Sequence, residues 1–124
     1  MVEKSKKILI IDDDADIVES VSLILKSAGF EVVSAGTAAE GIRKAQEEMP
    51  DMVLCDMMME TSDSGISAAR EIKHSCPRSP IILLSSIAAA TDGHADIAGI
   101  GFSATLQKPI DSRNLLRTVK TILK

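Results

Sequence analysis

The sequence predicts an α/β protein with a doubly wound parallel sheet, and two observations lead to that fold class. Short apolar segments alternate five times with segments of helical periodicity, and no break between them is long enough to be a linker. Such alternation implies right-handed crossovers that place helices on both faces of a parallel sheet. Three of the apolar segments lack polar alternation, as strands covered on both faces do: residues 8–11, 52–55 and 81–84.

Length and composition fit a single soluble domain, so we expect residues 1–124 to fold as one unit. Hydrophobic residues make up 45% of the chain and charged residues 26%, and the net charge of −4 argues against nucleic acid or an anionic membrane as a direct partner. No apolar segment approaches the roughly 18 residues of a membrane span. Two cysteines without zinc-type spacing favour a reducing cytoplasm over a disulfide framework.

Five strands are expected where β-branched and aliphatic residues gather between the helical segments. They are Lys7–Ile11, Glu31–Ala35, Met52–Asp56, Ile81–Ser85 and residues 103–107. Cys55 lies inside the third strand, where a small buried thiol is expected.

The first two helices have readable boundaries. The first takes Asp14 as its N-cap and ends at Gly29. Its apolar positions recur at helical spacing at Ile17, Val21, Ile24 or Leu25, and Ala28. The second begins with a capping box, in which Thr37 is followed by Glu40, and ends before Pro50. Its predicted buried face comprises Ala38, Ile42, Ala45 and Met49.

The sequence predicts three further helices, one of them only weakly. A third helix is predicted over Ser64–Ser75, and its core-facing positions are Ile66, Ala69, and Ile72 or Lys73. Residues 87–100 are rich in alanine and are interrupted by two glycines, which predicts only a short, marginal helix. The last helix, over residues 111–123, takes Asp111 or Ser112 as its N-cap. Its apolar face comprises Leu115, Leu116, Val119, Ile122 and Leu123.

Polar residues stand where four of the predicted strands end. Asp12 and Asp13 follow the first strand, Asp56 ends the third, Ser85 ends the fourth and Lys108 follows the fifth. The carboxyl ends of parallel strands meet at one edge of a sheet, where ligands bind near the change in strand order. We therefore expect one anionic pocket that also contains a hydroxyl and an ammonium group.

Several carboxylates in one pocket require a compensating charge, because a pair about 4 Å apart costs on the order of 4 kcal/mol at an effective dielectric near 20. The available ligands are oxygens, with no nearby histidine or clustered thiol, and this favours Mg²⁺, or alternatively Mn²⁺, over zinc. An aspartate flanked by such a cation, a hydroxyl and a lysine is equipped to attack phosphorus and form an acyl phosphate. Phosphoryl transfer to an aspartate is thus the predicted chemistry.

Four segments of the chain together carry a likeness to one signalling family. They are ILIIDDDADI at residues 8–17, VLCDMMM at 53–59, PIILLSS at 80–86 and QKPIDSRNLL at 107–116. In their order and spacing they resemble the receiver domain of two-component response regulators, and the likeness covers essentially the whole chain. It implies a flavodoxin-like fold with strand order 2-1-3-4-5 and five helices.

The resemblance also implies a role for each polar residue. Asp56 matches the phosphoacceptor, and the metal ligands would be Asp12, Asp13, Asp56 and the backbone carbonyl of Met58. Ser85 matches the hydroxyl that acts in switching, and Lys108 matches the phosphate-binding lysine. Pro109 stands where the family usually has a cis-proline.

The function implied by the resemblance is that of a signalling domain, not an enzyme, although the domain catalyses phosphoryl transfer to its own aspartate. A histidine kinase or phosphotransfer protein would donate the group, and an unidentified downstream protein would read the change. The face formed by the fourth helix, the fifth strand and the fifth helix would repack. A homodimer is expected to use the same face.

Two departures from the family pattern affect switching. The aromatic residue expected three positions before the lysine is Thr105 here, so the usual ring rotation cannot operate. The positions two residues after Asp56 and Ser85, which in the family flank the path of the hydrolytic water, are the apolar Met58 and Ile87. We therefore predict a long-lived phosphoaspartate.

Other functions compete with this interpretation. A degenerate receiver would act as a phosphorylation-independent interaction module; the missing aromatic favours it, and the complete set of acids, hydroxyl and lysine opposes it. A flavin-binding electron carrier would need a hydroxyl-rich loop after the first strand and aromatic residues around the ring, but the chain has acids there and only 2% aromatic residues. An aspartyl phosphatase would need Asp-x-Asp, whereas the two positions after Asp56 are Met57 and Met58.

Overall fold

Five parallel strands form one sheet in the order β2-β1-β3-β4-β5. The computed structural model describes residues 5–57, 64–85 and 103–123. The strands are β1 (Lys7–Ile11), β2 (Glu31–Ala35), β3 (Met52–Asp56), β4 (Ile81–Ser85) and β5 (Ala104–Gln107). The predicted flavodoxin-like fold and its strand order are confirmed. β5 begins one residue later than predicted, although the Ser103 N–H already donates to the Ile81 carbonyl over 2.9 Å.

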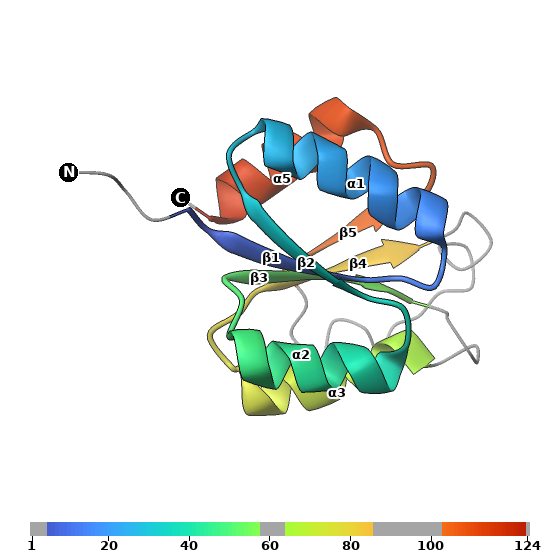
Figure 1. Ribbon diagram of the computed structural model, residues 1–124, viewed down its shortest axis with the longest axis vertical. Coiled ribbons are helices and arrows are strands. Elements are labelled where there is room, and N and C mark those ends of the chain that lie inside the picture. The colour runs from blue at the N-terminus through green and yellow to red at the C-terminus, as the bar shows by residue number, and fades with distance from the viewer. Residues whose placement is uncertain (1–4, 58–63, 86–102, 124) are drawn as a thin grey trace.

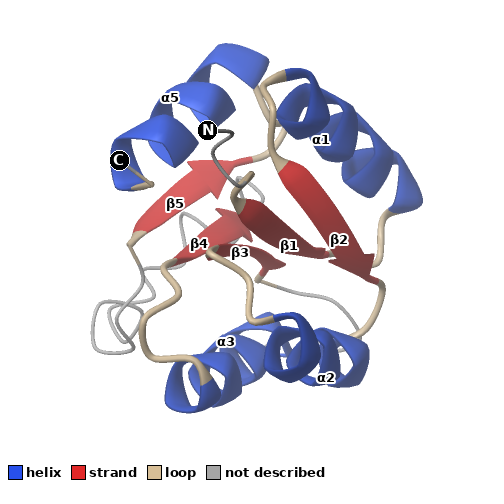
Figure 2. Ribbon diagram, turned by 60° about the vertical axis from the view of Figure 1, so that its left-hand side comes forward, coloured by secondary structure: helices blue, strands red, loops and turns tan. Residues whose placement is uncertain are grey.

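Helices cover both faces of this sheet, as Figures 1 and 2 show. α1 (Ala15–Ser27) and α5 (Ser112–Ile122) pack on one face, and α2 (Ala38–Glu48) and α3 (Ser64–Ser75) pack on the other. The helix predicted over residues 87–100 lies outside the described residues. Among the helices that are described, none has the length and apolar character needed to cross a membrane.

Alternate side chains of the central strands enter two separate cores. On β1, Ile8 and Ile10 join the core beneath α1 and α5, whereas Leu9 and Ile11 join the core beneath α2 and α3. All four side chains are fully buried. Burial on both faces explains why these strands lack polar alternation, and the prediction drawn from that pattern is confirmed.

Local capping explains where three of the helices begin. The predicted N-caps Asp14 for α1 and Thr37 for α2 are confirmed, and for α5 the N-cap is Asp111. Each side chain accepts a hydrogen bond from a backbone N–H of the first turn, which satisfies a donor that the helix itself cannot pair. Past the end of α1, Gly29 has a positive φ of 94°, in agreement with its predicted role in stopping that helix.

The prediction that Met49 is buried is wrong. Its side chain is 65% exposed. α2 ends at Glu48, and Met49 forms the C-cap with a left-handed backbone, at φ 48° and ψ 60°. Because this conformation breaks the helical periodicity, Pro50 is buried in place of Met49.

Replacing Gly41 with alanine should destabilise the fold, even though Gly41 lies inside α2. An added Cβ would meet three side-chain atoms of Ile11, the nearest of them Cδ1 at 2.6 Å. Ile11 is β-branched and fully buried in β1, so it has little room to move. Overpacking costs about 1–3 kcal/mol, which exceeds the gain of about 1 kcal/mol that alanine brings to a helix. Urea denaturation measures this loss in the free energy of unfolding.

Gly36→Ala is the matched control, because a Cβ at Gly36 would meet nothing within 4 Å. We expect its free energy of unfolding to stay within roughly 0.5 kcal/mol of the wild type. Equal losses in the two variants would show that the contact with Ile11 is not the cause.

Candidate functional site

Five polar residues from four strand ends lie along the carboxyl edge of the sheet. Asp12 and Asp13 directly follow β1, Asp56 and Ser85 are the last residues of β3 and β4, and Lys108 directly follows β5. All five strands are parallel, so their carboxyl ends lie along the same edge. The side chains that the sequence analysis singled out therefore lie on one side of the molecule.

Three carboxylates form the centre of the site. One oxygen each of Asp12, Asp13 and Asp56 lie within 4.8 Å of one another. Asp12 and Asp56 are buried, with 1% and 6% of their surface exposed, whereas Asp13 is exposed. Their mutual repulsion requires a nearby positive charge. The ligand atoms are all oxygens, which is the donor set that hard divalent cations prefer.

Lys108 supplies part of that positive charge. Its Nζ lies 3.0 Å from Oδ2 of Asp12 and 3.2 Å from Oδ1 of Asp56. Burial opposes the charged ammonium, but the hydrogen bond to Asp12 and the attraction of both carboxylates outweigh it. The pKa of Lys108 is therefore raised above its usual 10.5, and the side chain is a cation at neutral pH.

The hydroxyl of Ser85 is buried and has no hydrogen-bond partner among the described residues. Ser85 is 1% exposed, and its Oγ accepts and donates no hydrogen bond among the described residues. Its backbone carbonyl, by contrast, accepts from the Lys108 N–H over 2.7 Å. A buried hydroxyl without a partner costs about 1–3 kcal/mol. A ligand rich in oxygen at the carboxylate cluster would give this hydroxyl an acceptor.

The structure describes two of the four remaining residues that the sequence analysis singled out, Pro109 and Thr105. The Lys108–Pro109 peptide bond is cis, as the resemblance implied. Thr105 lies within β5 and is exposed. Met58, expected as a metal ligand through its carbonyl, and Ile87 both lie outside the described residues.

Cys55 precedes Asp56 but adds no nucleophile to the site. Burial, together with the charges of Asp56 and Asp12, raises the pKa of its thiol to about 12. The thiol is therefore neutral at physiological pH. The expectation of a small buried thiol in the third strand is confirmed.

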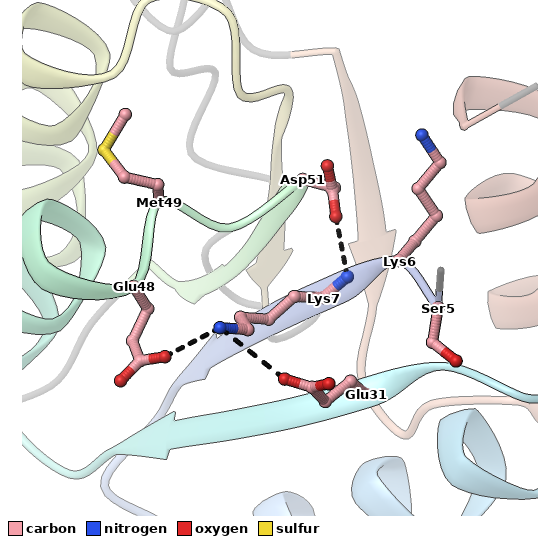
Figure 3. Close-up of a pocket in the computed structure, with 7 residues that line it drawn as sticks. All are labelled: Ser5, Lys6, Lys7, Glu31, Glu48, Met49 and Asp51. Atoms are coloured by element: carbon pink, nitrogen blue, oxygen red, sulfur yellow. Dashed lines mark hydrogen bonds and ion pairs between the residues drawn. The ribbon is translucent and has the colours of Figure 1, made fainter. Parts of the chain in front are cut away.

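A pocket at the opposite edge of the sheet, where the strands begin, contains ion pairs (Figure 3). Nζ of Lys7 lies 2.8 Å from Oε1 of Glu48 and 3.5 Å from Oε2 of Glu31. The backbone N–H of Lys7 donates to Oδ2 of Asp51 over 2.8 Å. These contacts tie the starts of β1 and β2 to the end of α2, and the sequence analysis did not single them out.

The Lys7–Glu48 pair should make stability depend on pH at both extremes. A hydrogen bond and attraction to Lys7 lower the pKa of Glu48 below its usual 4.5, and the same hydrogen bond raises the pKa of Lys7 above its usual 10.5 despite the opposing effect of desolvation. Because the pKa of Glu48 is lowered in the fold, Glu48 stabilises the protein above its unfolded pKa, and this stability is lost as pH falls through the folded pKa. Because the pKa of Lys7 is raised, Lys7 stabilises the protein below its unfolded pKa, and this stability is lost as pH rises through the folded pKa. We expect Glu48→Gln to lower the urea midpoint between about pH 5 and about pH 10, and this effect to fade as Glu48 becomes protonated at lower pH or Lys7 loses its proton at higher pH.

Glu71→Gln is the control for that series, since Glu71 is exposed and forms no ion pair within the described ranges. Its urea midpoint should follow the wild type at every pH. A Glu48→Gln effect that persisted at pH values where Glu48 is protonated would rule out the ion pair as its origin.

Comparison with known proteins places these features in a family. The model of the response regulator receiver domain matches residues 8–120. The alkaline phosphatase synthesis transcriptional regulatory protein PhoP of Bacillus subtilis (strain 168) is 31% identical over 123 residues, which cover 97% of this chain and 49% of PhoP. The transcriptional regulatory protein GlrR of Escherichia coli (strain K12) is 32% identical over 124 residues, which cover 100% of this chain and 28% of GlrR. The chain thus spans about half or less of the length of these relatives.

Solved structures agree with the sequence relatives. A response regulator receiver domain protein (CheY-like) from Methanospirillum hungatei JF-1 is 30% identical, with a TM-score of 0.89 and coverage of 97% of this chain and 94% of that one. The doubly wound sheet, its acidic edge and these matches together identify an α/β signalling domain. The chain belongs to the response regulator receiver domain family of two-component systems.

Proposed function

We propose that residues 1–124 form a phosphorylatable switch and that Asp56 accepts the phosphoryl group. The position of Asp56 carries the proposal. Its buried carboxylate lies 3.2 Å from the Lys108 ammonium, and its ligand atom lies within 4.8 Å of those of Asp12 and Asp13. Positive charge on the neighbours of a carboxylate offsets the negative charge that builds up when it attacks a phosphorylated donor.

The metal proposed for this site is Mg²⁺, with Mn²⁺ as the alternative. Its ligands would be Asp12, Asp13, Asp56 and the carbonyl of Met58. The oxygen-only donor set and the close approach of three carboxylates support this choice. A bound Mg²⁺ would neutralise charge on the carboxylates and on the transferring group.

In the proposed reaction, a carboxylate oxygen of Asp56 forms a bond to phosphorus while the bond between phosphorus and the donor breaks, and the donor keeps the electron pair. Lys108 stabilises charge on the phosphoryl oxygens, and the Ser85 hydroxyl donates to one of them. A histidine kinase or phosphotransfer protein is the proposed donor, in the cytoplasm, and a downstream protein reads the phosphorylated state. The domain acts on its own aspartate and does not turn over a separate substrate.

Intact-mass measurement after incubation with Mg²⁺ and a small-molecule phosphodonor tests the proposal. The wild type should gain the mass of one phosphoryl group only when Mg²⁺ is present, and Asp56→Asn should gain none. Glu71→Gln, a neutralisation on α3, should behave as the wild type does. If the wild type gains no mass, the chain is better explained as a phosphorylation-independent interaction module, which Thr105 in place of an aromatic already favours.

The phosphoaspartate should persist for minutes or longer. Met58 and Ile87 are apolar, so they offer no hydrogen bond to a water that would attack phosphorus. The half-life is measured by removing the donor and following the phosphorylated mass over time. Met58→Asn should shorten it, because an amide can orient water. A wild-type half-life of seconds would contradict this prediction.

A further inference from the structure

The outer side of α1 is acidic over its first two turns. Asp16 and Glu19 are exposed there, and Lys26, the single basic residue of α1, lies in the last turn. Leu23, four residues after Glu19 and hence on the same side of the helix, is 62% exposed. Among the described residues, Met49 is the other large hydrophobic side chain exposed to this degree.

The outer side of α5 is basic along its whole length. Arg113, Arg117 and Lys120 are exposed and recur at intervals of four and three residues, which aligns them along the helix. α5 contains no acidic residue. α1 and α5 lie side by side on the same face of the sheet in both views (Figures 1 and 2). An acidic strip and a basic strip therefore lie next to each other. We name the following six residues the α1/α5 surface: Asp16, Glu19, Leu23, Arg113, Arg117 and Lys120.

The charges of the α1/α5 surface form no ion pairs within the described part of the chain. Charges on α2 behave differently, since Arg43 lies 3.4 Å from Glu47 and 3.8 Å from Glu40. The two strips of opposite sign thus keep their charges available to a partner.

We infer that a second copy of this chain binds to the α1/α5 surface. Each helix follows a strand and runs back along the sheet, so the two helices point the same way. A twofold axis parallel to the helices places α1 of one copy over α5 of the other, again in the same direction. Asp16 and Glu19, in the first half of α1, then oppose Arg113 and Arg117, in the first half of α5. A twofold axis perpendicular to the helices would instead place α5 on α5, where basic residues run along the whole helix and like charges would be opposed.

The apolar part of the contact is supplied by Leu23. It follows Glu19 by about one turn, as Lys120 follows Arg117, so Leu23 lies over the aliphatic stem of Lys120 from the other copy. The twofold axis repeats every contact, so each favourable pair occurs twice. Because the charges on this surface complement those of an identical surface, we infer that the partner is a second copy of the chain.

This contact is separate from the homodimer expected through the fourth helix, β5 and α5, because it uses α1. It also does not depend on the proposed phosphorylation of Asp56. Both the phosphorylated and the unmodified protein would contain the α1/α5 surface.

Sedimentation equilibrium of the unmodified protein tests the inference. The wild type should associate reversibly to a dimer at about 0.05 M salt, and its dissociation constant should rise roughly tenfold or more at about 0.5 M salt. Glu19→Arg alone and Arg117→Glu alone should each weaken the dimer roughly tenfold or more, because each opposes like charges at two symmetric contacts. An equimolar mixture of the two variants should restore association, since both contacts in the mixed dimer again pair opposite charges.

Glu71→Arg and Arg70→Glu are the matched controls, because they make the same charge changes on α3, on the other face of the sheet. Both should associate as the wild type does. Three results would overturn the inference: a monomeric wild type at low salt, a dimer that neither reversal on the α1/α5 surface weakens, or weakened variants whose mixture fails to associate.

Discussion

In a Lys108→Met variant, Mg²⁺ should bind roughly tenfold more tightly than to the wild type, while phosphoryl transfer from a small donor should slow by roughly 10²- to 10³-fold. The two effects have one origin. The Lys108 ammonium lies 3.0 Å from Asp12 and 3.2 Å from Asp56, so it occupies oxygens that the metal needs. A +1 and a +2 charge about 5 Å apart repel by several kcal/mol at an effective dielectric near 20. Because a lysine side chain can turn away when the metal binds, only part of that repulsion appears in the affinity.

In the proposed reaction, the same ammonium stabilises the phosphoryl group. Methionine has a similar length and no charge, so Lys108→Met removes the stabilisation of the transferring oxygens and leaves the packing nearly intact. Isothermal titration with Mg²⁺ measures the affinity, and the initial rate of mass gain measures the transfer.

Lys6→Met is the control for Lys108→Met, because Lys6 is exposed and lines the pocket at the opposite edge of the sheet. It should change neither quantity. Weaker Mg²⁺ binding to Lys108→Met would mean that the lysine supports the site and does not compete with the metal.

The fold could be predicted from the sequence because every residue of β3 and β4, and every residue of β1 except Lys7, is buried. A strand such as Met52–Asp56, with all five residues buried, is specified by its own apolar run and needs no information from its neighbours. The site followed from the same argument. Once the strands are parallel, the residues that end them share one edge, so the order of residues along the chain was enough to bring Asp12, Asp56 and Lys108 together.

Two features could not be predicted because they depend on tertiary structure. In the sequence, Met49 continues the apolar spacing of α2 and is therefore expected to be buried. Only the structure shows that the backbone turns left-handed at Met49, so that the helix ends and the side chain points into solvent. Lys7 pairs with Glu48, 41 positions away in the chain. Many exposed lysines and glutamates have the same sequence surroundings, so the pattern does not indicate which of them meet. The distances from Lys108 to Asp12 and Asp56 likewise join residues far apart in the chain, so the sequence alone does not give them.

Asp13→Asn should make the protein more stable without Mg²⁺ and less stable than the wild type at high Mg²⁺. Asp13 is exposed, and one of its carboxylate oxygens lies within 4.8 Å of oxygens of Asp12 and Asp56, without an ion pair among the described residues. Its charge therefore adds repulsion when no metal is bound. At that separation the repulsion amounts to about 1 kcal/mol per pair in high dielectric, so removing it should raise the melting temperature by roughly 4 °C or more.

Mg²⁺ reverses this order, because binding stabilises only a fold that has the ligands. A metal at ten times its dissociation constant adds about 1.4 kcal/mol to the wild type, whereas a variant that lacks one charged ligand gains much less. Melting curves at increasing Mg²⁺ should therefore cross for the wild type and Asp13→Asn, and stay parallel for the wild type and Glu71→Gln. A variant that is less stable than the wild type in the absence of metal would show that Asp13 makes a stabilising contact. Repulsion among the three carboxylates could then not be the reason for the cation binding proposed at this edge.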